Sequence, residues 1–320
     1  MKIERKLVEF IADTKFEHLP KGAIDVIRDV TLNVVGTTIA GATSEGCDVL
    51  AGLVREWGGK KEATILIHGG QVPAHNAVLV NSTMARALEL DDAMLPGIHL
   101  GASTIPVALA TAELAGGCSG KEFLTTIVLG TELAARLNLL NLPSDYRGFD
   151  PTGVCGIFAA TAVAARILHL TKEQMLNSLG LALNKAAGSM QSNINGSLAV
   201  RVIQGFVAQA GILCALLAQK GITGPKNFLD GVFGYSHLYA KDTHNAEAVA
   251  GELGERFELV KTLFKKYPSC GLTQSATDAI LDLVRQESLS SEDVEQINIK
   301  MAPHAYSIVG HQFEIGDNPQ

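Results

Sequence analysis

Three carboxylates and one imidazole stand close together in residues 87–99. Their side chains are those of Glu89, Asp91, Asp92 and His99. Ionised carboxylates repel each other and lose solvation on burial, so such clustering costs stability in a packed protein. A site that moves protons uses it, because crowding and burial shift pKa values. The alternative interpretation is a solvated loop with an Asp cap.

Three other segments combine turn residues with ionisable or amide side chains. Residues 146–153 (YRGFDPTG) open a small-residue helical pattern, whose first N–H groups would be free to bind an anion. Residues 193–201 form an amide-rich loop that leads to Arg201, and residues 265–270 read KKYPSC. Each segment alone is also typical of a cap or loop. Together they suit binding of a small di- or tricarboxylate and proton transfer beside it.

Helical patterns must position these segments, because apolar residues recur at three- and four-residue spacing along most of the chain. The predicted helices cover residues 3–12, 20–41, 45–57, 73–89, 104–115, 119–138, 152–168, 171–189, 197–220, 245–256 and 273–286. Ser119 and Thr171 begin two of them with capping-box spacing. Residues 63–68 are the early strand candidate.

The pattern changes character near residue 260. Alternation in residues 294–301 predicts a β-strand after the last helix. We therefore expect a mainly α protein with an all-helical domain over residues 1–260 and the start of a smaller α+β lid domain over residues 261–320. One strand and one helix are too few for a sheet with a buried face. We therefore expect either that another chain supplies the rest of the lid or that its C-terminal part is missing from a shortened version of a longer protein.

Composition limits the partners that we expect. The 320 residues are 47% hydrophobic and 18% charged, with a net charge of −7 and no cluster of Lys or Arg, which argues against nucleic acid. Glu113 and Arg166 interrupt two apolar stretches that are too short to span a membrane. Five scattered cysteines without metal-binding spacing and a mixed-charge N-terminus predict a cytoplasmic protein with reduced thiols.

In the order and spacing of its segments the chain resembles the MmgE/PrpD family, whose members include 2-methylcitrate dehydratase, cis-aconitate decarboxylase and iminodisuccinate epimerase. The matching segments are residues 81–92, 106–117, 119–122, 151–156, 205–211, 221–225 and 265–270. The resemblance implies a homodimer with its active site in the cleft between a helical domain and a lid. It also implies a reaction without organic cofactor or metal. Family members are longer, and their C-terminal part completes the lid.

The resemblance also implies roles for single residues. The acidic run falls on Glu89, Asp91 and Asp92, the motif histidine on His99, and the lysine before Tyr-Pro on Lys265. The chain departs from the family at Ala93 (often Thr), Asp150 (commonly His), Val200 (often Lys) and Cys270 (His in decarboxylase-type members). Because a His and a Lys are lost, we expect a substrate less anionic than citrate-like acids.

The resulting hypothesis makes His99, Asp91 and Lys265 the catalytic residues. His99 would be the general acid or base, since an ordinary imidazole titrates near neutrality. Asp91 would orient His99 or act as a second base, and Lys265 with Arg201 would bind a substrate carboxylate. The predicted substrate-binding residues are Asp92, Tyr146, Arg147, Asp150, Arg201, Lys266 and Cys270. Glu89 and Asp92 are also expected to shape the loop.

Three functions remain open at this point. The favoured one is a lyase, a hydro-lyase acting on a 2-methylcitrate-like acid or a related decarboxylase. An epimerase of an amino- or imino-dicarboxylate is the second, because it needs two proton-handling groups and no leaving group. The third is a truncated, catalytically degenerate relative that only binds carboxylates, which the incomplete lid suggests.

Overall fold

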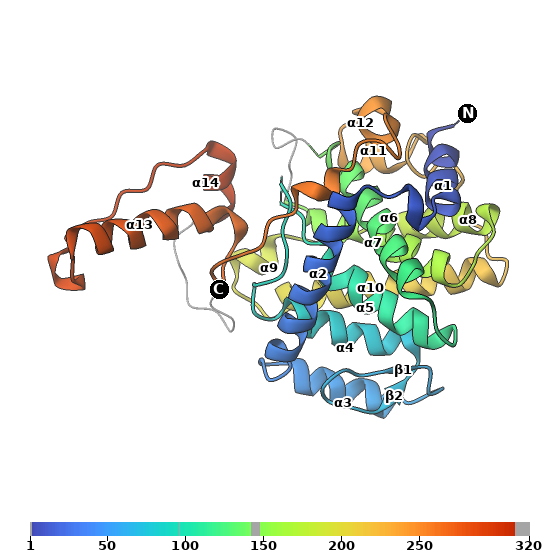
Figure 1. The fold of residues 1–320 in the computed structure, drawn as a ribbon, viewed down its shortest axis with the longest axis horizontal. Coiled ribbons are helices and arrows are strands. Elements are labelled where there is room, and N and C mark those ends of the chain that lie inside the picture. Colours follow the sequence, from blue (N-terminus) through green and yellow to red (C-terminus); the bar gives the residue numbers. More distant parts are fainter. Residues whose placement is uncertain (1, 96, 142–147, 311–320) are drawn as a thin grey trace.

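The computed structural model describes residues 2–95, 97–141 and 148–310, which form a helical body with a projecting C-terminal segment (Figure 1). The helices of the body are α1 (Ile3–Asp13), α2 (Lys21–Gly41), α3 (Cys47–Trp57), α4 (Ala74–Arg86), α5 (Gly101–Leu114), α6 (Gly120–Asn138), α7 (Pro151–Ile167), α8 (Lys172–Leu183), α9 (Gln191–Ile194), α10 (Ala199–Gln219), α11 (Tyr235–Tyr239) and α12 (Ala246–Ala250). The projecting helices are α13 (Gln274–Glu287) and α14 (Pro303–Val309). Single 3₁₀ turns occupy Phe16–His18, Glu258–Lys261, Gly271–Thr273 and Ser291–Asp293. The mainly α class is confirmed.

Both predicted helix starts have an N-cap hydrogen bond, and the second has the full capping box. The Ser119 hydroxyl accepts a hydrogen bond from the Glu122 N–H at the start of α6. At the start of α8, Thr171 and Gln174 form a reciprocal capping box, in which each side chain accepts the other residue's N–H. These bonds satisfy N–H groups that have no partner within the helix.

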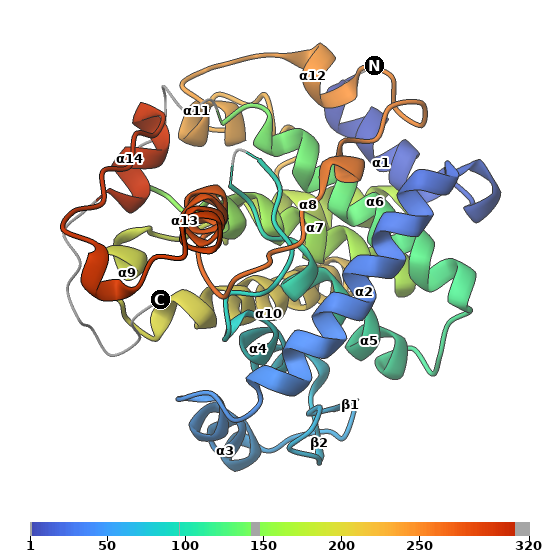
Figure 2. The ribbon, with the colours of Figure 1, turned by 60° about the vertical axis from the view of Figure 1, so that its left-hand side comes forward.

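Helices α7 and α10 form the centre of the body (Figure 2). They pack against each other, and α10 also packs on α4 and α8. Small residues permit this close approach. A Cβ added at Gly205 of α10 would lie 2.5 Å from the carbonyl oxygen of Leu79 in α4, and one at Gly211 would lie 2.5 Å from Cβ of Ala160 in α7.

Helix α10 is also long and apolar enough to cross a membrane by length and composition, which the shorter stretches considered in the sequence are not. Buried residues make up 56% of its most apolar window. Helices α4, α5, α7 and α8 pack on it, and a core helix passes the same test of length and composition. The observation is therefore weak support for a membrane span.

The early strand candidate forms only in part. Ala63–Thr64 (β1) pairs antiparallel with Gln71–Val72 (β2), with Ala63 opposite Val72. The chain turns between them through Gly69 and Gly70, whose φ angles of 71° and 87° favour glycine. The apolar stretch that follows β1 thus enters a turn instead of continuing the strand.

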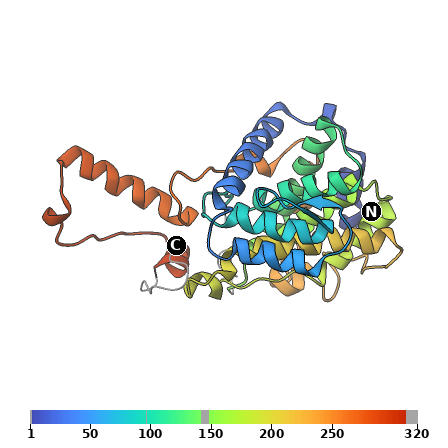
Figure 3. The same ribbon diagram turned by 90° about the horizontal axis from the view of Figure 1, so that it is seen from below.

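The strand predicted for residues 294–301 does not form within the described part of the chain. These residues have no ladder partner there, and Val294, Ile297 and Ile299 are exposed. A strand needs neighbours to satisfy its backbone and cover its apolar face. Helix α13 likewise buries no residue and stands away from the body (Figure 3). The division into a helical domain and a lid at residue 260 stays a prediction.

The buried ion pair of Glu132 and Arg136 fixes the path of residues 251–259, which lead from the helical body to the acidic loop. Glu132 of α6 accepts the N–H groups of Glu258 and Leu259, both at 3.0 Å, while Arg136 binds Glu132 and the Gly251 carbonyl. Leu263 then pairs with Ala93 through two backbone hydrogen bonds of 2.9 and 2.7 Å. This pairing lays the segment that carries the predicted lysine beside the loop between α4 and α5.

Substitution of Gly205 by Ala should lower the free energy of unfolding by about 1–3 kcal/mol, because the new methyl group would force α10 away from α4. Gly36→Ala is the matched control. Gly36 lies inside α2 with no atom within 4 Å of an added Cβ, so the change should be neutral or stabilise by up to about 1 kcal/mol. Urea unfolding followed by circular dichroism measures both. Equal effects would contradict the close packing of α10.

Candidate active site

The acidic residues and His99 lie in the loop between α4 and α5. Helix α4 ends at Arg86, earlier than the predicted residue 89, and Glu89 adopts a positive φ of 54°. This left-handed conformation is uncommon for a residue other than glycine and turns the chain out of the helix. The loop returns to a helical path at Gly101.

Asp92 closes the loop. Its carboxylate accepts the Gly101 N–H at 3.0 Å (Oδ1) and 3.3 Å (Oδ2), at the start of α5. Only glycine fits there, because a Cβ at position 101 would lie 2.2 Å from Oδ1 of Asp92. Burial, with the charge of Asp91, raises the pKa of Asp92 to about 7. The contacts favour the expected loop-shaping role of Asp92 over direct binding of substrate.

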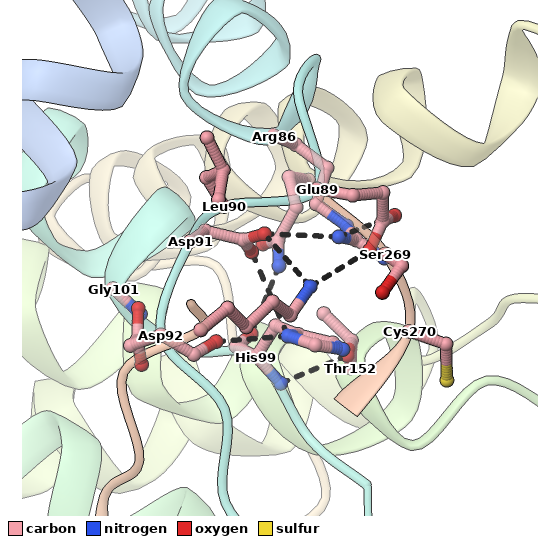
Figure 4. A network of polar contacts seen from close by, with 12 residues as sticks. Arg86, Glu89, Leu90, Asp91, Asp92, His99, Gly101, Thr152, Ser269 and Cys270 are labelled. Atoms are coloured by element: carbon pink, nitrogen blue, oxygen red, sulfur yellow. Dashed lines mark hydrogen bonds and ion pairs between the residues drawn. The ribbon is translucent and has the colours of Figure 1, made fainter. Parts of the chain in front are cut away.

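His99 is held by its backbone and its ring (Figure 4). Its N–H donates to Oγ1 of Thr152 at 3.1 Å, and its carbonyl oxygen accepts from Nε2 of Gln204 at 2.9 Å. The ring Nδ1 lies 2.8 Å from the carbonyl oxygen of Asp92. Because a carbonyl oxygen only accepts, Nδ1 carries the proton, and Nε2 keeps a lone pair in the neutral ring.

The surroundings keep the His99 ring neutral. Burial and the nearby cations Arg86 and Lys265 lower the pKa of His99 to about 4, against the opposing charge of Asp91. The side chain is 14% exposed. At neutral pH the imidazole is therefore a base with an available Nε2, and the ordinary histidine pKa assumed in the hypothesis does not apply.

Two cations pair with the carboxylates of Glu89 and Asp91. Nη1 of Arg86 forms ion pairs with Glu89 and with Oδ1 of Asp91, the latter at 2.9 Å. Nζ of Lys265 lies 2.8 Å from Oε2 of Glu89 and 3.5 Å from Oδ1 of Asp91, with the lysine side chain only 1% exposed. Burial alone would raise the pKa of Glu89, but Arg86 and Lys265 outweigh it and lower the value to about 2.

Asp91 lies beside His99, as the hypothesis pairs them. Its Oδ2 is 3.7 Å from Nδ1 of His99 and accepts no hydrogen bond from the described residues. The Asp92 carbonyl is the nearer acceptor for the same N–H. Asp91 thus acts on the ring through its charge. Among the described residues no group of three His, Cys, Asp or Glu side chains is arranged to hold a metal ion.

Asp150 caps α7 next to the same loop. Its Oδ1 accepts the N–H of Thr152 at 2.8 Å, and Thr152 in turn binds the backbone of His99. The sequence predicts that the N–H groups at this helix start are free for an anion, and for Thr152 that prediction is wrong because the Asp150 carboxylate occupies its N–H. Burial raises the pKa of Asp150, against the charge of Arg86.

Of the other predicted site residues, Arg201 and Lys266 bind other parts of the chain, and Cys270 lies at the edge of the cluster. Arg201 is buried, and its Nη1 donates to the carbonyl oxygen of Glu45 at 2.7 Å, in the loop between α2 and α3. Lys266 is exposed and pairs with Asp278 of α13 at 2.6 Å. Cys270 is half-buried at the edge of the cluster (Figure 4). Tyr146 and Arg147 lie outside the described residues.

Three residues of the site were not singled out in the sequence. They are Arg86, Thr152 and Gln204. Arg86 carries a readable signal, a cation one helical turn before an acidic run. Thr152 and Gln204 act on the backbone of His99 from α7 and α10, and no pattern of residue types marks such contacts.

Replacement of Lys265 by Met should lower the free energy of unfolding by about 3 kcal/mol or more, because Glu89 and Asp91 would keep one cation between two buried charges. The double variant Lys265→Met, Glu89→Gln should recover part of this loss. Lys266→Met is the control, since its exposed ion pair contributes little. Urea unfolding compares all three. Similar effects of the two lysine substitutions would contradict the buried network.

The lowered pKa of His99 predicts a pH-dependent contribution to stability. The folded value of about 4 lies below the ordinary value of 6.5, so between them the unfolded chain binds more protons and stability rises with pH. The wild type should therefore gain stability over His99→Gln as the pH rises from about 4 to 6.5, by up to about 3 kcal/mol. Urea unfolding at several pH values measures this difference. A difference independent of pH would show that the ring is not held neutral.

Comparison with known proteins adds the following similarities. The chain matches the MmgE/PrpD N-terminal domain over residues 5–248. It is 26% identical over 255 residues to a cis-aconitate decarboxylase of Aspergillus terreus, covering 76% of this chain and 51% of that protein. It is 24% identical over 274 residues to cis-aconitate decarboxylase of Homo sapiens, covering 83% and 56% respectively.

A third relative, a cis-aconitate decarboxylase-like protein of Aspergillus oryzae, is 22% identical over 299 residues, which cover 88% of this chain and 62% of the relative. The chain thus spans about half to three fifths of the length of these relatives. The matched family domain contains the acidic loop, His99, Thr152 and Gln204 and covers more than half of the 320 residues. The chain belongs to the MmgE/PrpD family.

Proposed function

We propose that the chain is a lyase that acts on a small di- or tricarboxylic acid, with Nε2 of His99 as the base. The observation that carries this proposal is the hydrogen bond from Nδ1 of His99 to the Asp92 carbonyl. It leaves the Nε2 lone pair available in a ring that burial and two cations keep neutral. A neutral imidazole at this position suits removal of a proton from the carbon next to a carboxylate.

Asp150 supplies the complementary acid. Its raised pKa favours a protonated carboxyl, while that of His99 is lowered, and environments that push two pKa values apart separate an acid from a base. In dehydration, His99 would take the proton from carbon, and the electron pair would pass into the carboxylate. The pair would then return to form the carbon–carbon double bond as the C–O bond breaks, and Asp150 would protonate the leaving hydroxide to water. In decarboxylation, carbon dioxide leaves and the acid returns a proton to carbon.

The charges of the cluster bear on the substrate. Arg86 and Lys265 can stabilise the negative charge that develops beside a carboxylate. Both already face Glu89 and Asp91, so the two cations of the described cluster are matched by two carboxylate side chains around a neutral His99. This balance supports a substrate less anionic than citrate-like acids. The relatives bear the name cis-aconitate decarboxylase, which makes that acid the first substrate to test.

An epimerase is the second candidate. The second titratable group, Asp150, lies across Thr152 from His99, and epimerisation needs two groups that exchange protons with one carbon. A homodimer, a small carboxylate ligand and a cytoplasmic location remain part of the proposal. A carboxylate-binding relative without activity is the outcome that would overturn it.

The test is proton NMR of the chain in D₂O with cis-aconitate, 2-methylcitrate and iminodisuccinate. We expect elimination or loss of carbon dioxide with one of them, and a rate lower by about 10²- to 10⁴-fold in His99→Ala, which lacks the base. His237→Ala is the control, because His237 of α11 is exposed at the surface, where its Nδ1 lies 2.8 Å from Oδ1 of Asp242. Exchange of the carbon-bound proton without elimination would favour the epimerase. Turnover by His99→Ala at the wild-type rate would refute the assignment of His99.

A further inference from the structure

We propose that Gln204 of α10 is a positioning residue that fixes the peptide backbone of His99 and thereby selects the acceptor of its ring proton. The consequence for catalysis rests on the proposed function of His99, whereas the geometry of the ring does not depend on it. Gln204 lies well outside the acidic loop in sequence, 105 positions after His99.

The contacts of Gln204 have one consistent orientation. Its side chain is fully buried, and Nε2 donates to the carbonyl oxygen of His99 at 2.9 Å. A reversed amide would place two carbonyl oxygens against each other, so the orientation follows from chemistry. Its Oε1 has no hydrogen-bond partner among the described residues. The amide group is therefore committed to His99 alone within that part of the chain.

Gln204 works together with Thr152. Thr152 accepts the N–H of His99 at 3.1 Å, so the peptide groups on both sides of the His99 Cα are held by side chains. These side chains come from α7 and α10, which pack against each other at the centre of the body. Within the loop itself, Met94 and Ile98 form a single bridge, and Gly97 has a φ of 111°. The rigid helices thus supply restraints that the loop lacks.

Two oxygens compete for the ring proton of His99. The carbonyl oxygen of Asp92 lies 2.8 Å from Nδ1, and Oδ2 of Asp91 lies 3.7 Å from the same atom. A carbonyl acceptor leaves the ring neutral, while a hydrogen bond to a carboxylate favours the protonated ring. A small shift of the His99 backbone would move Nδ1 from Asp92 to Asp91, and loss of the Gln204 amide permits that shift.

Other charged groups around the His99 ring determine how far its pKa changes when Nδ1 moves to another acceptor. Those that act on it are Arg86 from α4, Glu89 and Asp91 from the loop, and Lys265 from the C-terminal segment. The carboxylates of Asp92 and Asp150 bind the N–H groups of Gly101 and Thr152 instead. Helix α10 contributes Arg201, whose Nη1 binds the carbonyl oxygen of Glu45. Since the two cations oppose protonation, the carboxylate of Asp91 is the group whose approach would reverse the balance.

The test compares Gln204→Met with Gln209→Met in the full chain labelled with ¹⁵N-histidine. Methionine keeps the length and volume of glutamine but has no N–H donor. Gln209 is the matched control, a glutamine of the same helix whose Nε2 donates to Asn76 at 3.2 Å, away from the loop. Ring spectra from pH 4 to 8 report the tautomer and titration midpoint of His99. The signals that disappear in His99→Gln identify that ring.

We expect Gln204→Met to raise the midpoint of His99 by about one pH unit. We also expect a loss of the Nδ1–H signal bound to a carbonyl and a fall in kcat of about 10- to 100-fold, with a smaller change in KM. Gln209→Met should leave all of these as in the wild type. Gln204→Leu provides the same reading if the methionine variant does not fold. An unchanged tautomer and midpoint in a folded Gln204 variant would overturn the proposal.

Failure of this proposal and failure of the proposed function give different results. If the wild type turns over none of the acids, the ring spectra still test the role of Gln204. If the ring changes its acceptor in Gln204→Met while kcat stays at the wild-type value, Gln204 positions His99, but His99 is not the base.

Discussion

A buried set of alternating charges is the constraint on which the site depends. Glu89 and Asp91 are buried away from water, and Arg86 and Lys265 face them with the opposite charge. Lys265 comes from a segment 176 positions after Glu89. The acidic loop therefore has its charges paired only when that segment packs against it. The Ala93–Leu263 pairing and the anchoring of residues 258–259 by Glu132 support this packing, because they fix the path that brings the lysine to the loop.

The same charges divide the titratable groups into two classes. Glu89 is surrounded by cations and has a lowered pKa, and those cations also lower the pKa of His99. The carboxylates of Asp92 and Asp150 accept hydrogen bonds from backbone N–H groups instead, and burial raises their pKa values. Burial and the two cations thus produce a neutral base, while burial makes two neighbouring carboxyl groups hold protons more tightly than usual. The carboxyl groups of the site thus differ in pKa because Glu89 faces cations while Asp92 and Asp150 face backbone N–H groups.

Much of the fold can be predicted from the sequence, because apolar spacing and caps are local signals. The long helices appear near their predicted positions, while the short α9 and α11 carry too few turns to show a period. The strand predicted at residues 294–301 fails for the opposite reason, since pairing depends on a partner that alternation cannot supply. In the site, Asp91 and His99 are recognisable by type and spacing. The contacts of Gln204 and Arg201 could not be predicted, because both side chains bind backbone carbonyl groups, of His99 and Glu45 respectively. Every residue has such a carbonyl group, so the residue types do not reveal the partner.

The charge balance also restricts how a substrate can enter. A substrate carboxylate reaches Lys265 only in competition with Glu89, whose pKa of about 2 reflects how strongly its charged form is held. Each further carboxylate on the substrate would add a charge that the described cluster does not match. A hydroxyl group, by contrast, can accept a hydrogen bond from the carboxyl group of Asp150, the proposed acid at the start of α7. Among the acids of the proposed function, a dicarboxylate with a hydroxyl group on the carbon next to the reacting one fits these charges better than a tricarboxylate does.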